Sequence, residues 1–265
     1  MCVWLSTDYR RSRKKSRHGG VAFWVGMRIG GSTASAQRAT EGLLLGIDTC
    51  GPSGSVALGR LAAGRLEIPG EKGLASRSYS VTLVAAAGEL LQEAGVRVRD
   101  LAAMVVVKGP GSFTGVRVGL GAVKGLAEPG RTPVIAVSRL AVLAEKAGVD
   151  SAALDAHRHE VFLRWAAGSA DVRELLAGND ELTGLRNRPE RIAVCEEAAA
   201  ALLSEAWPKA ELIRVEPPTA RDAIQMAVRH FTAGEFVDVA LLDGHYLRRS
   251  DAEIFGEARS TVGRK

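Results

Sequence analysis

Two aspartates in this chain stand where acids could hold a metal ion. Asp48 ends the apolar run over residues 43–48, and Asp155 ends a similar run over residues 152–155. Both runs are typical of buried strands. A pair of carboxylates can hold magnesium through water molecules, so an enzymatic site is one interpretation. The other is that each acid only caps the turn after its strand, by accepting backbone N–H groups.

A glycine-rich turn is the second feature that could do chemistry. The motif KGPGSFTGVRVGL, residues 108–120, follows the apolar run over residues 104–107 and opens a helix that Ser112 is placed to cap. It has neither the Walker A spacing nor the G-x-G-x-x-G fingerprint. The turn is therefore either a cradle for an anion or the start of a close-packed helix. Four glycines favour close packing, since each costs roughly 1 kcal/mol of helix propensity relative to alanine; they are Gly115, Gly119, Gly121 and Gly125.

Other reactive groups form no recognisable site. The three cysteines are an odd number at wide spacing, which predicts neither a disulfide framework nor a zinc site but reduced thiols. His157 and His159 form the only close histidine pair, and H-x-H in a turn is typical of solvent-exposed histidines. No Gly-x-Ser-x-Gly nucleophile motif occurs. No apolar run reaches the roughly 18 residues that a membrane span needs. The sequence predicts a protein that is not in a membrane.

The elements around these residues follow one plan twice. In the first half, three expected strands within residues 43–68 precede a helix ending near Gly95, and strand, helix, strand and helix follow up to residue 147. From residue 152 the order restarts with three strands, then weaker helices and strands, and a last helix that Thr219 caps. The sequence thus predicts an α/β protein made of two similar subdomains, over residues 43–150 and 151–250.

The central motif, GPGSFTGVRVGL after an apolar strand, resembles the signature of the TsaB (YeaZ) family. The resemblance extends from residue 43 to about residue 255. It takes in LGIDT at residues 45–49, ALDA at 153–156 and YLRR at 246–249. The family is related to TsaD and to glycoprotease-like proteins, and it works in the synthesis of threonylcarbamoyladenosine in tRNA.

The resemblance implies a duplicated ribonuclease-H-like fold, as in actin and the sugar kinases, with a mixed sheet and helices in each subdomain. In that superfamily the acids at the ends of the two first strands flank a nucleotide phosphate and magnesium. Asp48 and Asp155 are at these positions, so they are candidates for a vestigial nucleotide site. The second half lacks a glycine-rich phosphate loop, since residues 194–198 read VCEEA. We therefore expect no cofactor on this chain, with ATP and magnesium used by the wider complex.

The resemblance further implies a non-catalytic subunit that pairs with TsaD, with the P-loop ATPase TsaE as another component. Together they transfer a threonylcarbamoyl group to adenosine 37 of tRNA. Without TsaD we expect a twofold homodimer through the same surface. The spacing of Gly115, Gly119 and Ala122 predicts a shallow groove for a partner helix. The full expected interface is Tyr79, Leu83, Ala87, Ser112, Phe113, Gly115, Val116, Gly119 and Ala122.

The catalytic relative TsaD carries a metal-binding His-x-x-x-His on its first long helix. Tyr79 and Leu83 stand at the matching positions here, and a phenol and an isobutyl group cannot replace two imidazoles as metal ligands. The alternatives, an ATP-dependent phosphotransferase or a metallopeptidase of the glycoprotease type, therefore lack their key residues. We expect no catalytic and no metal-binding residue in this chain.

The positive charge of the chain is concentrated at its start. Residues 1–42 carry eight basic and two acidic side chains, whereas the remainder is close to neutral. A near-neutral body argues against a broad nucleic-acid-binding face. We interpret residues 1–42 as a disordered extension, with a basic tail that touches RNA or a weak export signal as alternatives. Residues 251–265 are expected to be a flexible tail, and the protein is expected in the cytoplasm.

Overall fold

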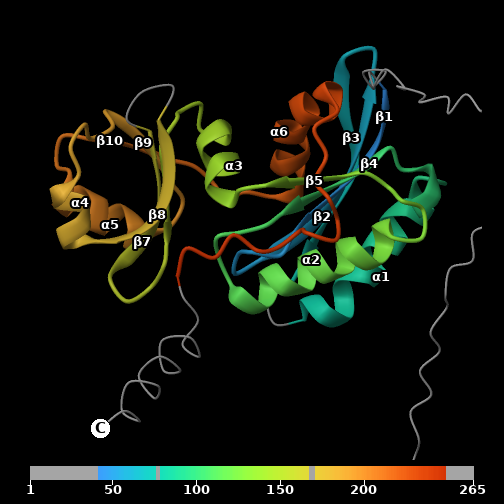
Figure 1. The fold of residues 1–265 in the computed structure, drawn as a ribbon, viewed down its shortest axis with the longest axis horizontal. Coiled ribbons are helices and arrows are strands. Elements are labelled where there is room, and N and C mark those ends of the chain that lie inside the picture. The colour runs from blue at the N-terminus through green and yellow to red at the C-terminus, as the bar shows by residue number, and fades with distance from the viewer. Residues whose placement is uncertain (1–40, 76–77, 167–170, 249–265) are drawn as a thin grey trace, which may run out of the picture. The chain divides into compact units, whose positions relative to one another are not determined.

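The computed structural model describes residues 41–75, 78–166 and 171–248. Within these ranges the chain forms two five-stranded sheets with helices packed on them (Figure 1). Of the extension expected over residues 1–42, only residues 41 and 42 are described, and the tail expected over 251–265 lies outside the described residues. None of the helices in the described ranges is long and apolar enough to cross a bilayer.

The first sheet has the strand order β3-β2-β1-β4-β5. Strands β1, β2 and β3 pair antiparallel as a meander, while β1, β4 and β5 pair parallel. Every residue of β4 is buried, as a strand with helices on both faces requires. The strands are β1 (Gly42–Asp48), β2 (Gly54–Ala62), β3 (Arg65–Leu74), β4 (Ala103–Val107) and β5 (Val134–Val137).

The second sheet repeats the arrangement with the order β10-β9-β6-β7-β8. Its first three strands again form an antiparallel meander. The first strand again pairs parallel with the strand that follows the meander in the chain, β9, which in turn pairs parallel with β10. The expected duplicated α/β fold with two mixed sheets is therefore confirmed. The strands are β6 (Ala152–Asp155), β7 (Glu160–Ala166), β8 (Val172–Gly178), β9 (Arg191–Val194) and β10 (Glu211–Arg214).

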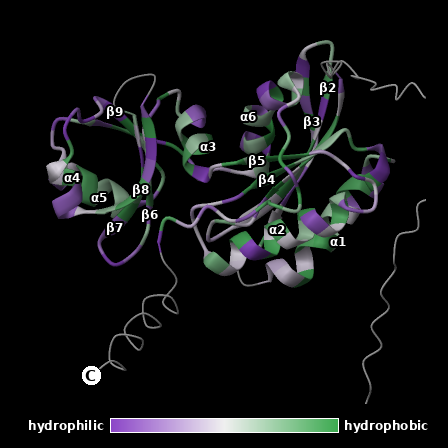
Figure 2. Cartoon of the chain, in the orientation of Figure 1, coloured by the Kyte–Doolittle hydropathy of each residue, from purple (hydrophilic) through white to green (hydrophobic). Residues whose placement is uncertain are grey.

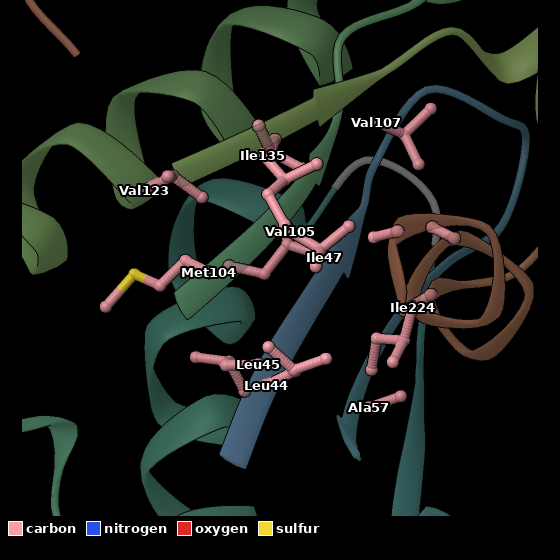
Figure 3. Close-up of a cluster of buried hydrophobic side chains, with 14 of the residues drawn as sticks. Leu44, Leu45, Ile47, Ala57, Met104, Val105, Val107, Val123, Ile135 and Ile224 are labelled. Carbon is pink, nitrogen blue, oxygen red and sulfur yellow. The ribbon is translucent and has the colours of Figure 1, made fainter. Parts of the chain in front are cut away.

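Helices cover both faces of the first sheet. Helices α1 (Tyr79–Glu93) and α2 (Phe113–Ala127) lie side by side on one face, and α6 (Ala220–Ala233) lies on the other (Figure 1). Val123 of α2 and Ile224 of α6 enter the same core from opposite sides of the strands (Figure 3). Figure 2 shows the apolar character of these strands, and mostly green and white bands along α1 and α2. A short 3-10 turn, η1 (Val98–Asp100), links α1 to β4.

The second sheet carries α4 (Asn179–Gly184) and α5 (Glu197–Ala206) on one side and α3 (Arg139–Lys146) on the other (Figure 1). Three apolar residues of α3 pack against the second sheet, where they form a cluster with residues of β6, β7 and β9. The other side of α3 faces α6, to which the Lys146 ammonium is joined by an ion pair with Asp222 at 2.8 Å. The α3 residues of the cluster are Leu140, Leu143 and Ala144.

The boundary between the two cores differs from the boundary expected at residue 150. Helix α6 comes after the second sheet in the chain, but its apolar residues belong to the core of the first sheet. Leu242 joins the same core, and Val237 forms a β-bridge with Val134 at the edge of that sheet. The last described part of the chain therefore returns to the first half and closes it.

Helix starts follow the expected caps. The Ser112 hydroxyl accepts from the Gly115 N–H at 3.3 Å, and the Ser138 hydroxyl accepts from the Ala141 N–H at 3.4 Å. Thr219 precedes α6 as expected, and its N–H donates to the Asp222 carboxylate at 2.9 Å. Each contact satisfies a backbone or side-chain group that the start of a helix leaves open.

Candidate functional site

A cleft of about 1160 Å³ lies between the turns that follow β1 and β6. The start of α2 and the first residue of α3 form part of its wall, and the segment over residues 245–248 lines it as well. The expected candidates Asp48 and Asp155 are thus brought to the same region, Asp155 in the wall and Asp48 buried behind it.

Both aspartates cap the turns after their strands. Asp48 Oδ1 accepts from the Cys50 N–H at 2.8 Å, and Asp155 Oδ1 accepts from the His157 N–H at 2.7 Å. Burial raises the pKa of Asp48, and the nearby Arg139 guanidinium opposes that rise. Asp155 remains partly exposed beside the His157 ring, with 3.0 Å between Oδ2 and Nδ1. The turn-capping role is therefore present in both halves. The described residues contain no group of three or more histidine, cysteine or acidic side chains that could hold a metal ion.

A half-buried carboxylate, that of Glu174 in β8, contacts side chains from both halves near the cleft. It accepts from the Ser138 hydroxyl at 2.8 and 2.7 Å and from Arg164 Nη1 at 3.0 Å. His245 Nε2 lies 2.9 Å from its other oxygen. These contacts lower the pKa of Glu174 although burial acts in the opposite direction.

The two described cysteines are poor nucleophiles. Burial raises the pKa of the Cys50 thiol well above its usual value, and its Sγ donates to the Val107 carbonyl at 3.2 Å. Burial, with the charge of Glu196, raises the pKa of Cys195 to about 12. Because the thiolate is the reactive form, neither residue offers covalent chemistry near neutral pH.

The segment over residues 245–248 lies along the cleft and contacts both halves. The His245 N–H donates to the Lys108 carbonyl at 2.7 Å. The Tyr246 and Phe113 rings lie 5.1 Å apart between centroids, and Cζ of Arg117 lies over the Phe113 ring, 3.8 Å from its centroid. Arg248 forms an ion pair with Glu160 of β7. The cleft wall is therefore built largely from groups that bind each other.

The glycine motif packs α2 closely against the turn after β1. A Cβ atom on Gly115 would overlap the Thr49 carbonyl oxygen, and a Cβ atom on Gly119 would overlap the Thr49 hydroxyl. That hydroxyl donates to the Gly115 carbonyl at 2.6 Å, and the Ser112 N–H donates to the Cys50 carbonyl at 2.8 Å. Close packing of α2 is therefore the reason for glycine at positions 115 and 119.

The prediction of a partner groove on Gly115 and Gly119 is wrong, because both glycines face the first sheet and the turn after β1 in their own chain.

The nine residues of the expected interface differ in how exposed they are. Ser112 and Phe113 are exposed and Ala122 is half-buried. The other six are buried within this chain: Tyr79, Leu83, Ala87, Gly115, Val116 and Gly119.

The opposite side of α1 and α2 is exposed and apolar. Val81 and Val84 of α1 are 79% and 53% exposed. Gly121 and Gly125 of α2 face outward, and a Cβ atom at either would meet nothing within 4 Å. We call this surface the α1–α2 outer face and define it by Val81, Val84, Ala85, Gly88, Gly121 and Gly125.

Sequence reasoning missed this surface, although the signal was present. Buried and exposed positions alternate at helical spacing, so Gly121 and Gly125 had to lie away from Gly115 and Gly119. It also missed Arg139 and Glu174. Their partners lie far away in the chain, as the 36 residues between Ser138 and Glu174 illustrate, and no local pattern marks such pairs.

Comparison with known proteins gives consistent similarities. Residues 73–179 match the family model described as "TsaD: tRNA N6-adenosine threonylcarbamoyltransferase". The tRNA threonylcarbamoyladenosine biosynthesis protein TsaB of Escherichia coli K12 is 30% identical over 232 residues, which cover 79% of this chain and 96% of that protein. The protein of the same name from Haemophilus influenzae is 37% identical over 125 residues, 45% of this chain and 51% of that protein. The structure of YeaZ from Pseudomonas aeruginosa superposes with a TM-score of 0.61 at 28% identity, and covers 77% of this chain and 99% of that one.

Proposed function

Because this chain belongs to the TsaB family of tRNA threonylcarbamoyladenosine biosynthesis proteins, we propose that it is the non-catalytic partner subunit of TsaD. The observation that carries the proposal is the α1–α2 outer face, where α1 exposes valines and α2 exposes glycines on which a Cβ atom would meet nothing within 4 Å. Exposed apolar surface of this kind marks an interaction site.

The shape of the outer face suits another pair of helices. Where glycines face outward, a partner helix can approach more closely than the usual 8–10 Å between axes. Val81 and Val84 then supply apolar area at the edge of that contact. The partner in this proposal is the corresponding helix pair of TsaD, packed two helices against two. Without TsaD the same face pairs with a second copy of this chain about a twofold axis.

The absence of catalysis in this proposal is supported by the use of Tyr79 and Leu83. Both are buried in the first core, and the Tyr79 hydroxyl donates to the Gly51 carbonyl at 2.9 Å. The positions that carry metal-binding histidines in TsaD therefore serve packing here. Chemistry on tRNA is left to TsaD, with TsaE and ATP as further components, and a cytoplasmic location is compatible with this work.

Reconstitution tests the proposal. We expect modified adenosine in tRNA when this chain is combined with TsaD, TsaE, ATP, threonylcarbamoyl adenylate and unmodified tRNA, and none when either this chain or TsaD is left out. Size-exclusion chromatography with light scattering should show a complex of one copy of each. The control is this chain alone with ATP. ATP turnover that Asp48→Ala abolishes would contradict a non-catalytic role.

A further inference from the structure

The cleft does not fit the magnesium and nucleotide phosphate that the superfamily places between its two first strands. A buried guanidinium is already there. Arg139 is only 4% exposed although it lines the cleft, and its backbone N–H donates to the Gly109 carbonyl at 2.8 Å. Its side chain lies against the turn after β1, where a Cβ atom on Gly51 would come within 3.2 Å of its Cζ.

Arg139 lines the cleft together with Glu196 of the second half, and its side chain packs on Gly51 in the turn that follows Asp48. Asp48 of the first half and Glu196 of the second both favour its charged form, and they keep the pKa of Arg139 above its usual value despite burial. Glu196 is held at the turn after β6, because its Oε2 accepts from the Asp155 N–H at 2.8 Å. A single cation, the Arg139 guanidinium, thus balances the charge of acids at both turns, where the superfamily places a divalent ion.

Hydrogen bonds do not satisfy the whole guanidinium group. Its Nε is buried without a hydrogen-bond partner among the described residues. A buried carboxylate needs a compensating charge, and arginine supplies one that is not lost by titration in the physiological range. A divalent cation entering the same space would meet this fixed positive charge.

We propose that Arg139 is a resident cation that takes the place of a divalent ion in the cleft: it compensates Asp48 and Glu196, links the two halves, and excludes metal. The inference goes beyond the proposed function and does not depend on TsaD. It requires that removal of the guanidinium should destabilise the fold, because the carboxylate of Asp48 is then left without a compensating charge.

Manganese binding to the full chain, followed by electron paramagnetic resonance, and urea titrations of variants test this. We expect no saturable Mn²⁺ site in the unmodified chain. Arg139→Gln should lower the folding equilibrium constant at least tenfold, and the double variant Arg139→Gln/Asp48→Asn should recover most of that loss, since it removes the uncompensated carboxylate. Arg248→Gln removes a cation from the cleft rim without freeing Asp48, so adding Asp48→Asn to it should not stabilise the fold, and this pair serves as the matched control.

Three results would overturn the proposal. The first is an Asp48-dependent Mn²⁺ site in the unmodified chain, and the second is an Arg139→Gln variant as stable as the unmodified chain. The third is a double variant that is no more stable than Arg139→Gln alone, which would show that Arg139 does not act through Asp48. If Arg139→Gln does not fold, the double variant should still recover folding.

Discussion

The cleft and the α1–α2 outer face both adjoin helix α2, but their residues are used in opposite ways. In and beside the cleft, charged and polar groups bind one another, as Arg248 binds Glu160 and Glu174 binds Ser138. On the outer face, Val81 is largely exposed, and a Cβ atom on Gly121 would meet nothing within 4 Å. The cleft has the position of a ligand site, yet several of its groups bind one another. The outer face is lined by exposed valines and glycines, and in the proposed function it is the surface that receives the partner.

Helix α2 contains the same contrast in its glycines. Gly115 and Gly119 are four residues apart and allow the helix backbone to touch Thr49. Gly121 and Gly125 have the same spacing, but a Cβ atom on either would meet nothing within 4 Å among the described residues. Substitutions on the inner side should therefore change stability, and substitutions on the outer side should change binding.

The largest expected effect is that of Gly119→Leu. A leucine side chain there would have to displace Thr49 and the strand β1 behind it, and overpacking of a core costs about 3 kcal/mol at its upper range. We expect the urea midpoint to fall accordingly, with much of the chain unfolded at low denaturant. A folded Gly119→Leu with an unchanged midpoint would mean that the inner side of α2 is not closely packed.

A smaller effect is expected for Glu174→Gln. The pKa of Glu174 is lowered in the folded protein from the usual 4.5. The charged form therefore stabilises the fold at neutral pH, and this contribution is lost as the pH falls below 4.5 through the folded-state pKa. The loss of a buried charged partner predicts that the free energy of unfolding falls by about 2 kcal/mol near pH 7, and by progressively less in acid.

Urea titrations across this pH range measure the difference. Glu197→Gln is the control, because the pKa of Glu197 is also lowered by an arginine but the side chain is exposed on the surface. It should change stability much less. An equal loss of stability for Glu174→Gln at neutral and acidic pH would show that its charge does not stabilise the cleft.

Much of the fold could be predicted from the sequence, because its signals are local. Apolar runs marked the strands, and Ser112 and Thr219 marked helix starts at the observed positions. The return of α6 to the first sheet could not be predicted in this way, since an amphipathic helix does not show which of two sheets it will cover. The orientation of α2 was missed because small residues occupy both of its sides, and the contact with Thr49 decides between them.

The most direct test of the account is the affinity of Gly121→Leu for TsaD, measured by calorimetry together with the melting temperature. Leucine is the better helix former by most of a kcal/mol, and a Cβ atom at this position meets nothing within 4 Å. Gly184→Leu, at an open and exposed glycine in α4, is the matched control. We predict a Kd at least tenfold weaker for Gly121→Leu, about 1.4 kcal/mol, with an undiminished melting temperature and unchanged binding by the control. A folded Gly121→Leu that binds TsaD as tightly as the unmodified chain would contradict the assignment of the outer face as the partner surface.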